Sequence, residues 1–176
     1  MLDFSTHLRT RCGQVWQAQC VVTMGKSTTY NRDAWSDRFN QPAAQTLEAS
    51  LQAAPAKLFA EARRWLKEIE GVSEVTCWYG DCWKWVLEYR VADASMLLAV
   101  LVPSPTDLQL AIPVDPDFLR AISTRRLKRA VRDGLDLAAE PFDTKWGVWS
   151  LQSASLVGDL QDLLLQKLAH LSRRAG

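Results

Sequence analysis

The sequence predicts an α+β domain in which an antiparallel sheet of about four to five strands is packed on one side by helices. Two observations carry this expectation. Segments with two-residue alternation follow one another through short turns, which is typical of antiparallel pairing. Segments with helical periodicity flank them and are amphipathic, so each has an apolar face to place against a sheet. The predicted order is two helices, a meander of three or four strands, a helix, a strand and a final helix.

The first two elements are helices. Pro42 suits a first helical turn, so a short helix is expected from about 42 to 52. Pro55 begins a second helix, which Gly71 ends. Its apolar side chains recur with helical spacing and form one stripe, which comprises Leu58, Phe59, Ala62, Trp65, Leu66 and Ile69.

Three of the eight tryptophans lie in one short segment, 76–90. The Tyr-Gly-Asp-Cys run at 79–82 predicts a tight turn, because glycine beside aspartate readily adopts positive φ. From residue 83 onward the positions alternate, which predicts a strand with one buried face. That face would carry Trp83, Trp85, Leu87 and Tyr89, and the opposite face Lys84, Val86, Glu88 and Arg90. We therefore expect a hairpin with an aromatic inner face.

Three further strands are expected. Residues 96–102 are apolar at every position, which indicates a central strand covered on both sides. Residues 108–112 alternate and are ended by Pro113, and a last strand is expected over 146–151.

Two helices complete the pattern. Asp115 and Pro116 provide a cap and a first-turn proline for a helix over 116–133, with Gly134 as its stop. Ser153 opens the final helix, whose apolar stripe comprises Leu156, Val157, Leu160, Leu163, Leu164, Leu168 and Leu171.

Composition restricts the classes of function. The 176 residues carry 21 basic and 20 acidic side chains. This near-neutral balance argues against a dedicated nucleic-acid-binding protein. The sequence opens without an apolar export signal, and its longest apolar run is too short to cross a bilayer. We expect a cytoplasmic protein without a membrane segment.

The residues that could carry chemistry are few. The cysteines Cys12, Cys20, Cys77 and Cys82 are expected to be thiols, since no export signal is visible. Structural zinc needs four close ligands, so we expect no metal, and we assign no cofactor. The histidines, His7 and His170, have no evident catalytic partner in the pattern, and we assign no catalytic residue.

We interpret the first 40 residues as an N-terminal extension, with one loosely alternating strand over 14–22 and a polar loop over 23–33. The loop contains Gly25-Lys26-Ser27, the end of a phosphate-binding motif. Cys20 stands where that motif requires glycine, so the loop is not expected to hold phosphate. The main α+β domain is expected over 41–176.

Four pieces of the chain, in order, carry a resemblance to a known family. They are the helical entry over 42–70, the Tyr79-Gly80-Asp81-Cys82-Trp83-Lys84-Trp85-Val86-Leu87-Glu88-Tyr89 strand, the Leu98–Pro103 strand, and Lys145-Trp146-Gly147-Val148-Trp149-Ser150 with its leucine-rich helix. Together they resemble the YdhG-like group of small α+β domains and a related bacterial domain of unknown function. The resemblance implies that fold over 41–176 and carries over no functional residues.

The predicted helix over 116–133 is the strongest candidate surface. It carries a group of basic side chains, namely Arg125, Arg126, Lys128, Arg129 and Arg132. One interpretation is an ordinary solvated face, since exposed helix faces are usually charged. The other is an anion-binding surface for an acidic protein partner, a phosphate or a nucleic acid.

The aromatic residues have two interpretations as well. Trp83, Trp85 and Tyr89 either fill the core or line a pocket for a flat or apolar small molecule. Our leading hypothesis is a non-catalytic binding or accessory protein that uses the basic helix. The alternative is a small-molecule-binding protein with a tryptophan-lined pocket, and the third is an enzyme of unrecognised class.

Overall fold

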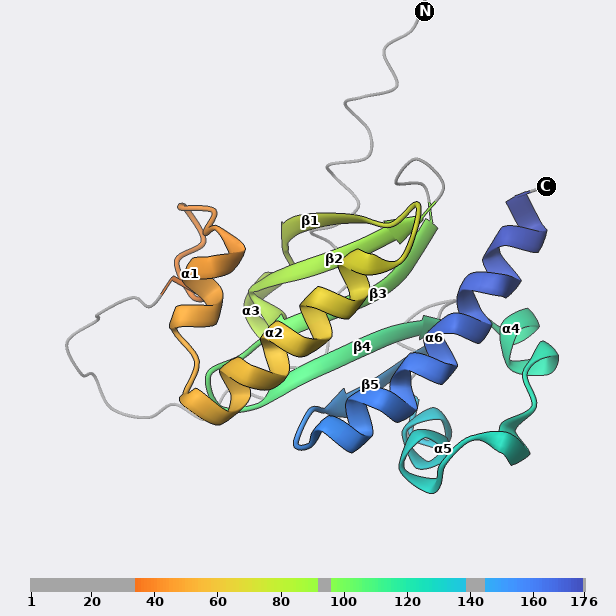
Figure 1. Ribbon diagram of the computed structural model, residues 1–176. Helices are drawn as coiled ribbons and strands as arrows, with labels where there is room; N and C mark the ends of the chain where they lie inside the picture. Colours follow the sequence, from red (N-terminus) through yellow and green to blue (C-terminus); the bar gives the residue numbers. More distant parts are fainter. Residues whose placement is uncertain (1–33, 92–95, 139–144, 176) are drawn as a thin grey trace, which may run out of the picture.

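The computed structural model describes residues 34–91, 96–138 and 145–175, so the predicted strand over 14–22 and the loop over 23–33 lie outside the described residues. The described chain forms one five-stranded antiparallel sheet in the order β1-β2-β3-β4-β5 (Figure 1). Each strand pairs with the next along the chain, so the topology is a simple meander. The predicted α+β class is confirmed.

The strands lie close to their predicted positions. They are β1 (Ser73–Trp78), β2 (Trp85–Val91), β3 (Met96–Pro103), β4 (Leu108–Val114) and β5 (Lys145–Ser150). The fully apolar β3 is the central strand, as its sequence predicts. Strand β4 runs on through Pro113 to Val114, where it pairs with β5 alone.

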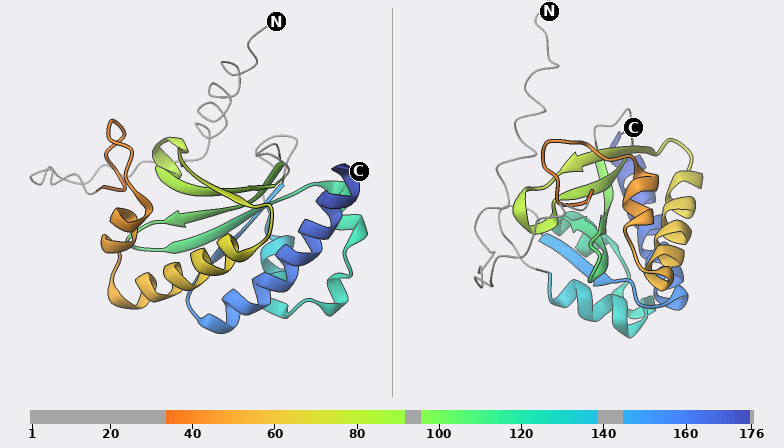
Figure 2. Two further views of the ribbon diagram at one scale, coloured as in Figure 1. Left: turned by 45° about the horizontal axis from the view of Figure 1, so that its top comes forward. Right: turned by 90° about the vertical axis from the view of Figure 1, so that its left-hand side faces the viewer.

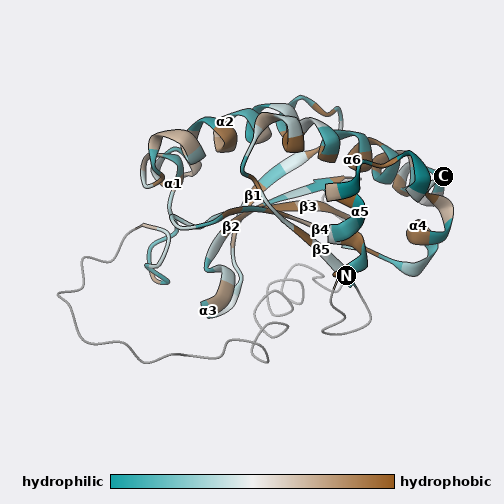
Figure 3. Cartoon of the chain, turned by 90° about the horizontal axis from the view of Figure 1, so that it is seen from below, coloured by the Kyte–Doolittle hydropathy of each residue, from teal (hydrophilic) through white to brown (hydrophobic). Residues whose placement is uncertain are grey.

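The helices gather mainly on one face of the sheet. They are α1 (Ala44–Ala49), α2 (Ala53–Glu68), α4 (Pro116–Ala121), α5 (Arg129–Asp136) and α6 (Ala154–Ala175), with a 3-10 turn η1 (Thr124–Arg126). Helices α2 and α6 lie side by side across this face (Figures 1 and 2). The one-turn helix α3 (Gly80–Trp83) lies on the opposite side of the sheet (Figure 3).

The main core lies between the sheet and these helices. From β2 it takes Trp85, Leu87 and Tyr89, which alternate as predicted. Phe59 and Leu66 of α2 reach the same core and are fully buried. The apolar stripe of α6 packs in this core as well. At the start of α6 the hydroxyl of Ser153 accepts a hydrogen bond from the Leu156 amide at 3.3 Å, as expected of a cap.

The predicted position of Trp83 is wrong. Lys84 takes positive φ (51°) and ends α3, so the two-residue alternation starts only at Trp85. Trp83 therefore packs in a second, smaller cluster on the other face of the sheet, with Val86 and Val100. Because this face is apolar too, β2 is buried on both sides.

The predicted helix over 116–133 is also wrong as one element. It is divided into α4, η1 and α5, and the backbone is extended at Ile122 and Leu127, each with ψ of 146°. The helix breaks because Phe118 and Leu127 are both buried in the core. Leu127 follows Phe118 by nine positions, which is about two and a half turns of an α-helix. A straight helix would point them in opposite directions. The break lets both side chains face inward.

Gly134 lies inside α5 and does not end it. A Cβ at this position would collide with the indole ring of Trp149. The same indole nitrogen donates a hydrogen bond to the Ala130 carbonyl at 3.2 Å. Glycine is therefore needed here because α5 approaches the β5 tryptophan closely, and not because of a turn.

Candidate functional site

The basic residues form an exposed surface although they do not share one helix. We define the basic segment as residues 124–132, and its five cationic side chains are all exposed: Arg125, Arg126, Lys128, Arg129 and Arg132. The segment contains no acidic residue. Its formal charge is thus +5 in a chain of net charge +1, so the remainder of the chain sums to −4.

The backbone of the basic segment is held firmly against the fold. Leu127 and Val131 are buried in the main core, and the Ala130 carbonyl accepts the hydrogen bond from Trp149. These anchors point inward while the cationic side chains project to solvent. Arg129 forms an exposed pair with Asp133, with 3.5 Å between the guanidinium nitrogen and the carboxylate oxygen, and such pairs contribute little to stability.

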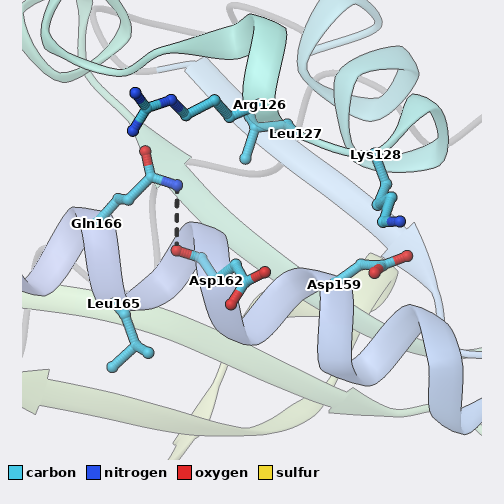
Figure 4. A pocket seen from close by; sticks show the side chains of 7 residues that line it. All are labelled: Arg126, Leu127, Lys128, Asp159, Asp162, Leu165 and Gln166. Atoms are coloured by element: carbon cyan, nitrogen blue, oxygen red, sulfur yellow. Dashed lines mark hydrogen bonds between the residues drawn. The ribbon is translucent and has the colours of Figure 1, made fainter.

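A groove of about 270 Å³ lies between the basic segment and α6 (Figure 4). Its lining combines both signs of charge with apolar and amide groups, namely Arg126, Leu127, Lys128, Asp159, Asp162, Leu165 and Gln166. The side chain of Gln166 donates a hydrogen bond to the Asp162 carbonyl at 3.3 Å. In Figure 4, Lys128 extends across the groove toward Asp159.

The structure does not bring the three predicted pocket residues together. Trp85 is buried in the main core and donates its indole N–H to the Asp37 carbonyl at 2.7 Å. Tyr89 is on the same side, fully buried. Trp83 is on the other side of the sheet, stacked on Tyr79 and edge-on to Trp146 with centroid separations of 5.9 and 5.6 Å. One cavity cannot be lined by all three residues.

A partly buried polar network joins α2 to the first two strands. Arg63 donates two hydrogen bonds to Glu74, each of 2.9 Å, and Tyr89 donates a third at 3.0 Å. Burial raises the pKa of Glu74, but the hydrogen bonds from Arg63 and Tyr89 and the positive charge of Arg63 outweigh it, so the pKa is lowered overall. Burial, followed by the charge of Glu74, raises the pKa of Tyr89. The network serves to satisfy polar groups at the edge of the core.

Glu88 is a buried carboxylate on the other face of the sheet and is only 1% exposed. The Tyr79 hydroxyl donates a 2.5 Å hydrogen bond to one of its oxygens, and Arg90 donates a 2.6 Å bond to the other. A buried charge needs such partners. The alternation of β2 predicts that Glu88 and Tyr89 lie on different faces of the sheet. It does not predict that Glu88 is buried, which follows because both faces carry apolar clusters.

Lys167 of α6 is a buried amine at a split in the sheet. Strand β3 pairs with β4 only up to the Val100–Ala111 pair, and the two strands then diverge (Figure 1). The Lys167 Nζ lies at this opening, 2% exposed, and donates to the carbonyls of Leu97 and Leu98 at 3.0 and 2.8 Å. Burial lowers the pKa of Lys167 to about 7, against the raising effect of Asp115.

His170, one turn after Lys167, packs beside α4. Its ring lies 5.6 Å from that of Phe118, and its Nε2 lies 4.0 Å from an Asp115 oxygen. This Nε2 is buried and has no hydrogen-bond partner among the described residues. Asp115 accepts a 2.8 Å hydrogen bond from the Phe118 amide, which confirms its predicted capping role.

The position of Lys167 in the sequence is itself a signal of its burial. It lies three and four residues from Leu164 and Leu171, and is thus on the apolar stripe of α6. A single lysine on such a stripe must be buried with hydrogen-bond acceptors or must extend out to solvent. The split between β3 and β4 supplies the acceptors, and nothing in the sequence of α6 indicates that split.

The cysteines agree only in part with expectation. Cys77 carries a thiol, as predicted, whereas Cys82 is disulfide-bonded, so the predicted thiol at Cys82 is wrong. Disulfide formation depends on two Cα atoms lying about 4.4–6.8 Å apart, a distance that spacing along the chain does not give. Among the described residues, no group of three or more potential ligands could hold a metal ion.

None of the helices that the structure describes is both long and apolar enough to span a membrane. Comparisons with family models, curated proteins and solved structures find no match for this chain. The class of the protein is therefore given by its fold, an α+β domain built on an open antiparallel meander. The resemblance to YdhG-like domains stays a prediction.

Proposed function

We propose that this protein is a non-catalytic binding protein that contacts an acidic protein partner through the basic segment. The observation that carries the proposal is the concentration of five exposed cations in nine residues without one acidic residue. Exposed charge of one sign steers an oppositely charged partner and excludes partners of like charge. The buried anchors Leu127 and Val131 support the proposal, because a surface held in one shape loses less entropy on binding.

A protein partner suits the charge distribution better than a nucleic acid does. The chain outside the basic segment sums to −4. A nucleic acid that extended beyond the segment would meet this excess of negative charge, whereas a compact acidic patch on a protein would not. The resemblance to YdhG-like domains, which we retain as a proposal, adds no competing site.

The experiment compares two double charge reversals. Arg125→Glu with Arg129→Glu alters the basic segment. Lys57→Glu with Arg64→Glu makes the same change in net charge at exposed positions of α2. Each variant and the wild type are immobilised, native host extract is applied at about 50 mM salt, and partners eluted by salt are identified and then titrated as purified proteins.

The expected result is at least a tenfold loss of affinity, about 1.4 kcal/mol, for the segment variant alone. Circular dichroism and urea denaturation check that both variants fold, since reversal of exposed charges should change the free energy of unfolding by less than about 1 kcal/mol. A folded segment variant that keeps wild-type affinity for every partner would overturn the proposal.

A further inference from the structure

The groove between the basic segment and α6 has walls of opposite charge. Arg126 and Lys128 lie on the wall formed by the segment, and Asp159 and Asp162 lie on the wall formed by α6 (Figure 4). The two walls come from parts of the sequence about thirty residues apart, and the fold brings them together by burying Leu127 and the apolar stripe of α6 in one core.

These four charges face one another without closing into ion pairs. In the part of the chain that the structure describes, the ion pairs join other residues, and none of these four side chains lies within 4.0 Å of an opposite charge. A gap between two walls of opposite charge is suited to a molecule that carries both charges itself, because each end then finds a partner of opposite sign.

The size of the groove restricts the ligand. Pockets for drug-sized molecules measure about 300–1,000 Å³, and this groove measures about 270 Å³. Leu127 and Leu165 add apolar surface to the lining, and Leu165 is half exposed. A ligand here would be small, with two opposite charges and an apolar part.

We propose that this groove binds a small zwitterion of amino-acid or dipeptide size. The carboxylate of the ligand is bound by Arg126 and Lys128, its ammonium group by Asp159 and Asp162, and an apolar side chain packs against the leucines. An anion alone would be repelled by the α6 wall, and a cation alone by the segment wall. The groove therefore selects for the presence of both charges.

The zwitterion proposal can be tested independently of the acidic partner, because the groove and the exposed face of the basic segment can be altered by different variants. Asp159 and Asp162 belong only to the groove, and Arg125 and Arg129 belong only to the exposed basic surface. A variant at either pair reports on one surface and leaves the charges of the other in place.

The probes are L-leucine, N-acetyl-leucine and leucinamide. They share one side chain, but the first carries both charges, the second only the carboxylate and the third only the ammonium group. Each is titrated into the full-length, isotope-labelled protein at low salt and pH 6.5, below the ordinary pKa of an α-amino group. Amide signals of residues 126–128 and 159–166 are followed by NMR.

For the wild type we expect leucine to shift these signals with a Kd of about 1–10 mM, since the groove is open to solvent. Both capped compounds should bind at least tenfold more weakly. Absence of saturable shifts with leucine up to 50 mM (roughly five times the weakest expected Kd) would overturn the proposal. Equal affinity for leucine and a capped compound would overturn it as well.

Two variants test the wall assignments. The double variant Asp159→Asn with Asp162→Asn should bind leucine at least fivefold more weakly than wild type does, and should bind N-acetyl-leucine no more weakly. The variant Arg126→Gln should lose affinity for leucine and N-acetyl-leucine but not for leucinamide. The Arg125→Glu and Arg129→Glu variant should bind leucine within about twofold of wild type, because its charges are exposed and screened. Loss of leucine binding in that variant alone would place the site outside the groove.

Discussion

Lys167 provides the sharpest test of the fold, because it is a buried amine in an otherwise apolar helix stripe. Lys167→Met keeps most of the side-chain volume and removes the amine. It also leaves the carbonyls of Leu97 and Leu98 without their donor. That loss costs about 1–3 kcal/mol for each carbonyl, and it is the same at every pH. The dependence of stability on pH therefore isolates the amine.

The sign of that dependence follows from the two protonation states. In the unfolded chain Lys167 has the ordinary pKa of 10.5, whereas burial lowers the pKa in the folded chain to about 7. Between these values the unfolded chain binds more protons, so stability rises as pH rises. A difference of one bound proton between the unfolded and the folded chain changes the free energy of unfolding by about 1.4 kcal/mol per pH unit. From pH 7 to 9.5 the wild type should gain about 3 kcal/mol relative to Lys167→Met.

The assay is urea denaturation at half-unit steps over this range. Lys57→Met, at an exposed position of α2, is the matched control and should keep the wild-type slope. Stopping at pH 9.5 avoids ionisation of tyrosine in the unfolded chain, which would lower stability because burial raises the pKa of Tyr89. Parallel curves for wild type and Lys167→Met would refute the reasoning and show that the two carbonyls keep the amine protonated throughout.

Three further predictions concern packing and the acid range. Gly134→Ala should destabilise the protein by about 1–3 kcal/mol, because the added Cβ would collide with Trp149. Its control is Gly158→Ala, which should stabilise the protein by up to about 1 kcal/mol because the added Cβ would meet nothing within 4 Å. Trp85→Ala should cost roughly 3–5 kcal/mol in thermal or urea unfolding, and a loss below 1 kcal/mol would contradict its burial. Folding lowers the pKa of Glu74, so its ionised carboxylate should add to the free energy of unfolding above the ordinary pKa of 4.5. This stabilisation should be lost as the pH falls through the lower pKa of the folded state, and Glu74→Gln should flatten that part of the acid unfolding curve.

The positions of the strands and of most helices could be predicted because local patterns determine them. The alternation from Trp85 to Val91 and the uninterrupted apolar run of β3 are properties of short segments, and the structure keeps both. The caps at Asp115 and Ser153 are equally local, since each satisfies backbone amides within one turn. Exposure of the basic side chains followed from their charge alone.

Local patterns could not predict the backbone conformation of Lys84, nor the features that depend on distant segments meeting. The positive φ at Lys84 moved Trp83 to the other face and separated it from Trp85. The helix over 116–133 broke because Phe118 and Leu127 must reach one core from positions that a straight helix places on opposite sides. The oppositely charged groove exists because α6 packs beside the basic segment. Local periodicity thus determined most of the elements, and long-range burial determined where the predicted helix over 116–133 breaks and how side chains from distant segments meet.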